Sequence, residues 1–144
     1  MSSSRSDAER PRETDVAHVL LDASAVLAMI WREPGAEVVG AAMRDGAAIS
    51  TVNLAEVAAL LHYRGWKGSD VESTLAAFRM DTLPFDSDVA LSSGALRPAT
   101  APTGLGLGDR ACLATAAHFE LPVLTTDRSW LRIDLEGIEV RVIR

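Results

Sequence analysis

Short apolar segments alternate with helical segments along this chain, and this alternation is the strongest constraint on its fold. Apolar residues recur at helical spacing between the short segments. Such an alternation predicts an α/β domain with a mainly parallel central sheet. The expected strands are 18–21, 47–50, 82–85, 122–125 and 138–142, and the expected helices are 22–31, 36–44, 52–64, 69–80, 86–97, 108–119 and 128–133.

Proline and glycine set several of the expected boundaries. Pro34 and Gly35 separate the first two helices, and Pro84 suits only an edge strand because proline cannot donate to a ladder. Pro98 is expected to close the helix that begins near Asp86. The Pro, Gly and Thr content of residues 99–107 predicts a loop.

The length of 144 residues suits one domain. Residues 1–15 are polar and charged without apolar periodicity, so we expect a disordered tail there and a single domain over 16–144. The single cysteine, Cys112, excludes an internal disulfide and suggests a reducing compartment. The sequence has no apolar run of about 20 residues and no apolar signal segment at its start, so we expect a cytoplasmic protein without a membrane span.

The formal charge of −6 argues against a broad basic surface for nucleic acid. An enzyme with this charge that acts on nucleic acid would need help at its site, and divalent cations could supply it. Lys67 is the only lysine, and the chain lacks Gly-Lys-Ser/Thr. These absences disfavour a receiver domain, a haloacid-dehalogenase-like phosphatase and a P-loop enzyme. The run of glycines in 104–108 has the wrong place and spacing for a dinucleotide site.

Four acidic residues follow or neighbour the carboxyl ends of expected strands. Asp22 follows the first strand, Glu56 lies one turn into the helix after the second, and Asp127 follows 122–125. Asp109 begins the helix before that strand. The carboxyl ends of parallel strands share one edge of a sheet, so the four acids should converge there. Their repulsion would require a bound cation or retained protons, and carboxylates without His or Cys suit Mg²⁺ or Mn²⁺.

Helix capping is the alternative explanation for each acid taken singly. Asp22, Asp109 and Asp127 occupy expected N-cap positions, and Asn53 with Glu56 matches the pattern of a capping box. Capping is the better explanation of any one of them. The convergence of all four favours a metal site.

The acidic segments 20–25, 53–57, 107–114 and 124–128 resemble the four motifs of PIN-domain nucleases, and VapC-type toxins of toxin–antitoxin pairs in particular. The resemblance covers about residues 16 to 144, and its most specific part is Gly-Asp-Arg-Ala-Cys-Leu-Ala at 108–114. It implies a single PIN-like domain, an α/β/α sandwich around a mainly parallel central sheet. It also implies a metal-dependent endoribonuclease that hydrolyses RNA phosphodiester bonds.

The resemblance implies roles for the acids as well. Asp22 and Asp109 would be central ligands of Mg²⁺ or Mn²⁺, and Glu56 and Asp127 would complete the catalytic and metal-binding set. The implied partners are an RNA substrate, a cognate small antitoxin and a second copy of the chain in a homodimer. Amphipathic helices between residues 36 and 78 could supply such interfaces.

Five further residues lie near the acids in the sequence, and each can be explained either by a role in function or by a role in local structure. Ser24 and Thr126 could orient a carboxylate or a water, or could be turn hydroxyls bonded to local backbone. Arg110, Arg128 and Arg132 could contact RNA phosphates or lie on solvated helix faces. Arg128 and Arg132, four residues apart, would share one side of an α-helix. A PIN-like module that binds RNA or protein without cutting is the alternative to the nuclease.

Overall fold

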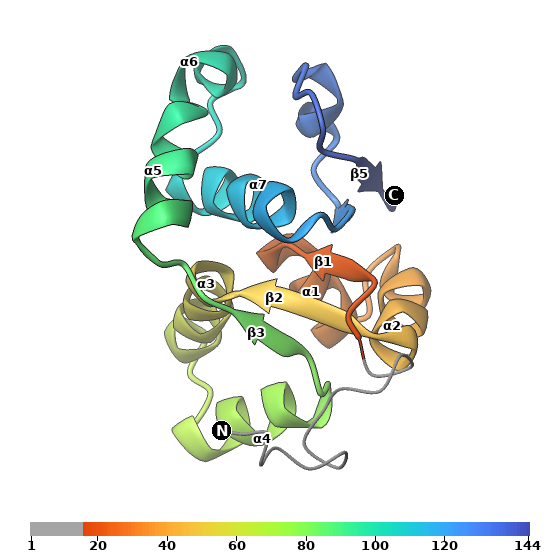
Figure 1. Ribbon diagram of the computed structural model, residues 1–144. Helices are drawn as coiled ribbons and strands as arrows, with labels where there is room; N and C mark the ends of the chain where they lie inside the picture. Colours follow the sequence, from red (N-terminus) through yellow and green to blue (C-terminus); the bar gives the residue numbers. More distant parts are fainter. Residues whose placement is uncertain (1–15) are drawn as a thin grey trace, which may run out of the picture.

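Five short strands form one sheet in which every neighbouring pair runs parallel (Figure 1). The computed structural model describes residues 16–144, so the tail expected for 1–15 lies outside the described residues. The spatial order of the strands is β3-β2-β1-β4-β5. The strands are β1 (Val19–Leu21), β2 (Ala47–Ser50), β3 (Asp81–Leu83), β4 (Val123–Thr125) and β5 (Val140–Val142).

The strand order reverses direction between β1 and β4. The chain runs outward from β1 through β2 to the edge strand β3, then crosses back to place β4 and β5 on the other side of β1. At this junction Leu21 of β1 pairs with Leu124 of β4. Open α/β sheets hold their ligands at such a reversal, beyond the carboxyl ends of the two strands.

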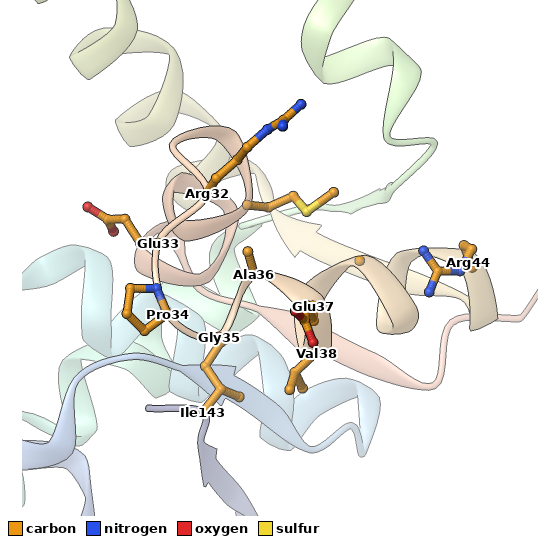
Figure 2. A pocket seen from close by; sticks show the side chains of 11 residues that line it. Arg32, Glu33, Pro34, Gly35, Ala36, Glu37, Val38, Arg44 and Ile143 are labelled. Carbon is orange, nitrogen blue, oxygen red and sulfur yellow. The ribbon is translucent and has the colours of Figure 1, made fainter.

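The helices lie on both faces of the sheet, which confirms the expected α/β fold (Figure 1). Pro34 and Gly35 end the first helix as expected, and Figure 2 shows this turn beside Ile143 near the end of the chain. The backbone of Gly35 has φ +97, a conformation that favours glycine. The helices are α1 (Ala23–Ile30), α2 (Ala36–Asp45), α3 (Thr51–Tyr63), α4 (Gly68–Ala77), α5 (Ser87–Ala95), α6 (Arg97–Thr100) and α7 (Leu107–Phe119).

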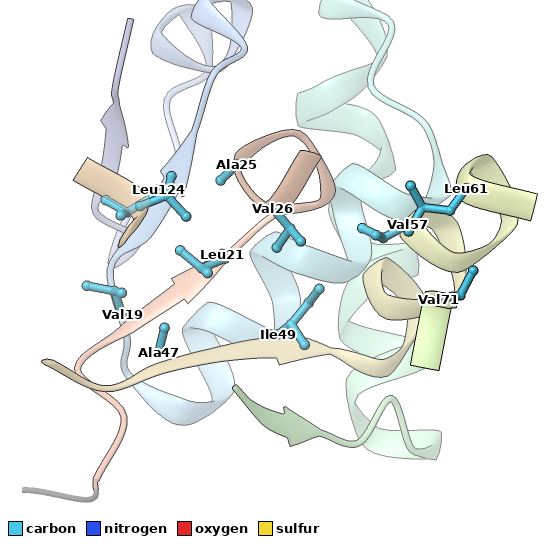
Figure 3. Packing of buried hydrophobic residues seen from close by; sticks show 11 residues of the cluster. Val19, Leu21, Ala25, Val26, Ala47, Ile49, Val57, Leu61, Val71 and Leu124 are labelled. Carbon is cyan, nitrogen blue, oxygen red and sulfur yellow. The ribbon is translucent and has the colours of Figure 1, made fainter. Parts of the chain in front are cut away.

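Alternate residues of each strand supply two separate cores. Leu21 and Ile49 face the cluster that also contains residues of α1, α2, α3 and α4 (Figure 3). Leu20 and Ala48 face the opposite cluster, where they meet Leu113 of α7. Both clusters include fully buried side chains, so neither face of the sheet is open to water along β1 and β2.

Small side chains let α7 lie deep in the fold. Six consecutive residues of this helix are buried: Ala111, Cys112, Leu113, Ala114, Thr115 and Ala116. A run of six covers every side of a helix with 3.6 residues per turn, so α7 is enclosed on all sides there. The helix packs against β1, β2 and β4 and is covered by α3 and α5.

The structure corrects three expectations about boundaries and one about the type of a helix. Residues 99–107, expected as a loop, contain the end of α6 and the 3₁₀ turn η3 (Ala101–Thr103). Pro98 lies in the first turn of α6, where a missing N–H breaks no helical bond, and it therefore does not close α5. Helix α7 begins at Leu107, two residues before Asp109. The short helix expected at 128–133 is the 3₁₀ turn η4 (Arg128–Arg132). Within residues 16–144, no helix has both the length and the apolar character needed to cross a membrane.

Candidate active site

Asp22 is buried at the reversal of strand order. It follows β1 and is the N-cap of α1, since its Oδ1 accepts the Ala25 N–H at 2.9 Å. The same oxygen accepts the Ser24 hydroxyl at 2.7 Å, and Oδ2 accepts the Thr125 hydroxyl at 2.7 Å. Only 4% of the residue is exposed. Capping therefore explains one of its three hydrogen bonds, and the bond to β4 needs another explanation.

The surroundings of Asp22 oppose its ionisation. Burial raises the pKa of Asp22 to about 6, against the lowering effect of the hydrogen bonds from Thr125, Ser24 and Ala25. The negative charge of Asp109 raises this pKa further. A carboxyl group in this position gains from a nearby cation, because a cation would compensate the charge that burial disfavours.

Two hydroxyl groups join the start of α1 to the end of β4. The Ser24 Oγ accepts the Thr126 N–H at 3.0 Å, and the Thr125 Oγ1 accepts the Asp127 N–H at 3.0 Å. Ser24 therefore contacts both Asp22 and β4, whereas Thr126 contributes its backbone N–H. The sequence analysis missed Thr125, although a polar residue at the end of a buried strand was a signal that could have found it.

Glu56 lies in the second turn of α3, after β2. The Asn53 amide donates to Glu56 Oε1 at 2.8 Å and to the Gly108 carbonyl at 3.0 Å. The cap of α3 is Ser50, whose hydroxyl accepts the Val52 N–H at 3.2 Å. The capping-box explanation of Asn53 and Glu56 is therefore wrong, because these residues lie inside the helix.

Asp109 is the third residue of α7, whose N-cap is Gly106. Its carboxylate accepts the Gly106 N–H at 3.2 Å, so the expected N-cap role is replaced by a bond back to the cap. Burial raises the pKa of Asp109, and the charges of Glu56 and Asp127 raise it further. The Gly106 N–H and Arg110 act in the opposite direction.

Asp127 is exposed and caps η4, where its Oδ1 accepts the Ser129 N–H at 2.9 Å. Asp109 interacts electrostatically with each of the other three acids, so it is the centre of the acidic group. Over residues 16–144, however, no three His, Cys, Asp or Glu side chains are grouped tightly enough to surround one ion.

The donor set still fits Mg²⁺ or Mn²⁺. Four carboxylates supply only hard oxygen ligands. Mg²⁺ keeps several waters and commonly uses one or two protein carboxylates, so it does not need a closed protein cage. Burial, together with the neighbouring negative charges, raises the pKa of Asp22 and of Asp109, and a bound cation would oppose both effects.

The arginines near the acids have different surroundings. Arg110 donates from Nη1 to the Leu105 carbonyl at 2.9 Å and is half-buried. Arg128 donates to the Arg144 carbonyl at 2.9 Å. Arg132 is exposed on η4. The expectation that Arg128 and Arg132 share one side is wrong, because residues four apart in a 3₁₀ helix point about 120° apart.

A groove of about 1030 Å³ lies away from these acids. Figure 2 shows its lining, which comes from the end of α1, the α1–α2 turn, α2 and Ile143. Arg32 and Arg44 line it, as do the apolar Met29 and Val38. None of the four acids is among its lining residues, so this groove and the acidic group are separate features.

A model of the PIN domain family matches residues 19–136, and the chain therefore belongs to the PIN domain family. The match includes all four acidic segments named in the sequence analysis, and it confirms the family resemblance. Among curated proteins, no relative matches the sequence.

Solved structures share this fold over nearly their whole length. A chain of DNA-bound VapBC from Salmonella typhimurium is 19% identical, with 90% of this chain and 100% of that chain covered at a TM-score of 0.70. A toxin–antitoxin complex from Klebsiella pneumoniae contains a chain that is 22% identical, with 88% and 98% covered and a TM-score of 0.68. For VapBC-5 from Mycobacterium tuberculosis the identity is 28%, the covered shares are 89% and 98%, and the TM-score is 0.56.

Proposed function

We propose that this PIN-domain protein is a metal-dependent endoribonuclease that hydrolyses RNA phosphodiester bonds, as the toxin of a toxin–antitoxin pair. The observation that carries the proposal is the acidic group at the reversal of strand order. Four segments of the chain contribute one carboxylate each, and Asp109 interacts electrostatically with the other three. A structural role does not require so much like charge at one edge of a sheet.

In this proposal Asp22, Glu56, Asp109 and Asp127 would hold Mg²⁺ or Mn²⁺. A bound ion of this kind lowers the pKa of a coordinated water and stabilises the leaving oxygen of a phosphodiester. Ser24 and Thr125 fix the Asp22 carboxylate from two sides, at 2.7 Å each. Asp22 must be ionised to serve as a ligand, so metal binding should release protons at pH values near its pKa of about 6.

The proposed RNA contacts come from arginines near the acids. Arg110 follows Asp109, and its Nη1 bond to Leu105 holds the guanidinium beside the start of α7. Arg128 follows Asp127, and Arg132 is the exposed arginine of η4. Arginine side chains at these positions would contact RNA phosphates in a protein whose overall charge is negative.

The proposed partners are a small antitoxin and a second copy of the chain, in the cytoplasm. Support comes from the VapBC complexes that share the fold, and from apolar residues left exposed on α2 and α5, such as Val38 and Leu91. A pull-down with the product of the neighbouring gene, combined with light scattering of the free protein, tests both partners. A monomer that captures no such product would contradict them.

The first test of the nuclease is cleavage of total RNA by the purified protein with Mg²⁺, Mn²⁺ or EDTA. Asp22→Asn should abolish cleavage, because Asn keeps the size and the cap but removes the charge that a cation needs. Asp86→Asn is the matched control, since Asp86 also caps a helix, with its Oδ1 accepting the Val89 N–H at 3.1 Å, and lies outside the acidic group. Folded wild-type protein that leaves RNA intact with either metal would contradict the nuclease and favour a module that binds without cutting.

A further inference from the structure

The carboxylate of Glu56 is held on two sides by Asn53 and Gly108, neither of which is an acid. On one side, the Asn53 amide donates to its Oε1 at 2.8 Å and to the Gly108 carbonyl at 3.0 Å. On the other side, the carboxylate lies against the Cα of Gly108, one residue before Asp109. Asn53 thus bridges α3 and α7 at the point where Glu56 and Asp109 meet.

Hydrogen-bonding chemistry fixes the orientation of the Asn53 amide. Both neighbours, the Glu56 carboxylate and the Gly108 carbonyl, are acceptors, so the NH₂ group must face them. The Asn53 Oδ1 is then buried, and within residues 16–144 no partner reaches it. An unpaired buried oxygen is costly, and only 1% of Asn53 is exposed. Asn53 bears this cost while it donates to the Glu56 carboxylate and the Gly108 carbonyl, which points to a role in positioning Glu56.

Gly108 leaves the space that the Glu56 carboxylate occupies. A Cβ at position 108 would overlap the carboxyl carbon and both oxygens of Glu56. The overlap involves the end of a flexible side chain, so an alanine there would displace Glu56 without forcing the backbone apart. By contrast, Gly94 in α5 has no atom within 4 Å of the point where a Cβ would lie.

We propose that Asn53 and Gly108 are positioning residues that hold the Glu56 carboxylate next to Asp109, so that both acids can serve as ligands of a divalent cation. This inference rests on the proposed function. Asn53 occupies Oε1 of Glu56 and restricts the rotation of its side chain. The start of α7, where backbone N–H groups point outward, favours a negative charge at the same place. Loss of either residue should leave all four carboxylates present but Glu56 misplaced.

The test measures Mn²⁺ binding by calorimetry, and RNA cleavage as a function of Mn²⁺ concentration, for Asn53→Ala, Asn53→Asp and Gly108→Ala. Each variant should weaken Mn²⁺ binding by about 10- to 100-fold, as loss of a residue that orients a metal ligand commonly does. Cleavage should recover in part at high Mn²⁺. Asn53→Asp keeps the shape but replaces the donor with a negative acceptor, so it should be at least as harmful as Asn53→Ala.

Two matched controls separate positioning from folding. Gly94→Ala adds the same methyl group in open space on α5, and Thr115→Val removes a buried hydroxyl of α7 that bonds the Ala111 carbonyl at 2.7 Å, away from Glu56. Both should bind Mn²⁺ as the wild type does. In a Glu56→Ala background, Asn53→Ala should change Mn²⁺ binding no further, because Asn53 acts through Glu56. Melting temperatures identify any variant that fails to fold, and Asn53→Ser then replaces Asn53→Ala.

The outcomes distinguish this inference from the proposed function. If the wild type cuts RNA and the Asn53 and Gly108 variants keep its Mn²⁺ affinity and metal dependence, the positioning role is refuted and the nuclease stands. If the wild type neither binds Mn²⁺ nor cuts RNA, both are refuted. A drop in melting temperature with unchanged Mn²⁺ affinity would also refute the positioning role, because it would show a structural contribution alone.

Discussion

Ionisation of the buried Asp22 should make the metal-free protein less stable as pH rises. The pKa of its carboxyl group is about 6 in the folded chain and 3.8 ordinarily. Between these values the unfolded chain has lost the proton and the folded chain still holds it, so the unfolded state binds fewer protons. The free energy of unfolding therefore falls as pH rises through this window and levels off above it. The difference between the two pKa values of Asp22 corresponds to a loss of about 3 kcal/mol in the free energy of unfolding across this window.

Asp22→Asn removes this penalty because the amide is neutral at every pH. Its carbonyl oxygen can still accept from Ala25 and Ser24, and its NH₂ group can donate to the Thr125 Oγ1 once that hydroxyl turns its own proton away. In EDTA at pH 8 we expect Asp22→Asn to be more stable than the wild type by about 1 to 3 kcal/mol. Near pH 4 the wild-type carboxyl is protonated in the folded chain, so the advantage should vanish there.

Urea unfolding followed by circular dichroism at pH 4 and pH 8 measures both values, and Asp86→Asn controls for the loss of an exposed, capping charge. With Mg²⁺ at about a thousand times its Kd at pH 8 the order should reverse, since a cation that binds only the folded wild type then adds about 4.1 kcal/mol. The reasoning is refuted if Asp22→Asn is less stable than the wild type at pH 8 in EDTA. A difference that does not change with pH would refute it equally.

Three further predictions concern the core and the surface. Burial raises the pKa of the Cys112 thiol, so Ellman's reagent should label it only after unfolding in urea, and rapid labelling of the native protein would contradict its enclosure in α7. Leu113→Ala should lower the free energy of unfolding by about 2 to 5 kcal/mol, and a loss below 1 kcal/mol would show that this side chain is not packed against the sheet. Arg144→Ala breaks an ion pair with Glu33 whose side chains are 37% and 40% exposed, so urea unfolding should detect a loss below about 1 kcal/mol.

Buried strands and amphipathic helices were predictable because their burial leaves a repeating apolar pattern. Residues 47–50 form β2 at the predicted bounds, and 36–44 became α2 with one residue added. The prediction of a loop over residues 99–107 was wrong because Pro98 was interpreted as the end of a helix. Proline in a first helical turn satisfies the same local rules, and only the packing of the surrounding chain decides between a loop and α6.

The acidic group was predictable from topology, since parallel strands share their carboxyl edge. Among the residues that hold the acids, Ser24 was named from the sequence as one that could orient a carboxylate, but Thr125 and Asn53 were not. Thr125 bonds Asp22 across 103 positions, and Asn53 bonds Gly108 across 55. No spacing rule relates residues so far apart. In addition, Asn53 and Glu56 matched the pattern of a capping box, and this local interpretation obscured the bonds that Asn53 makes to Glu56 and Gly108.

The pairing of β1 with β4 also determines when the acidic group can form during synthesis. A growing chain that has reached residue 100 contains Asp22 and Glu56 but lacks Asp109, β4 and the Thr125 hydroxyl that binds Asp22. Segments made after residue 100 therefore complete the group, and a chain released at that length contains two of the four acids of the group. The order of strands in the sheet thus delays assembly of the site until nearly the whole domain has been made.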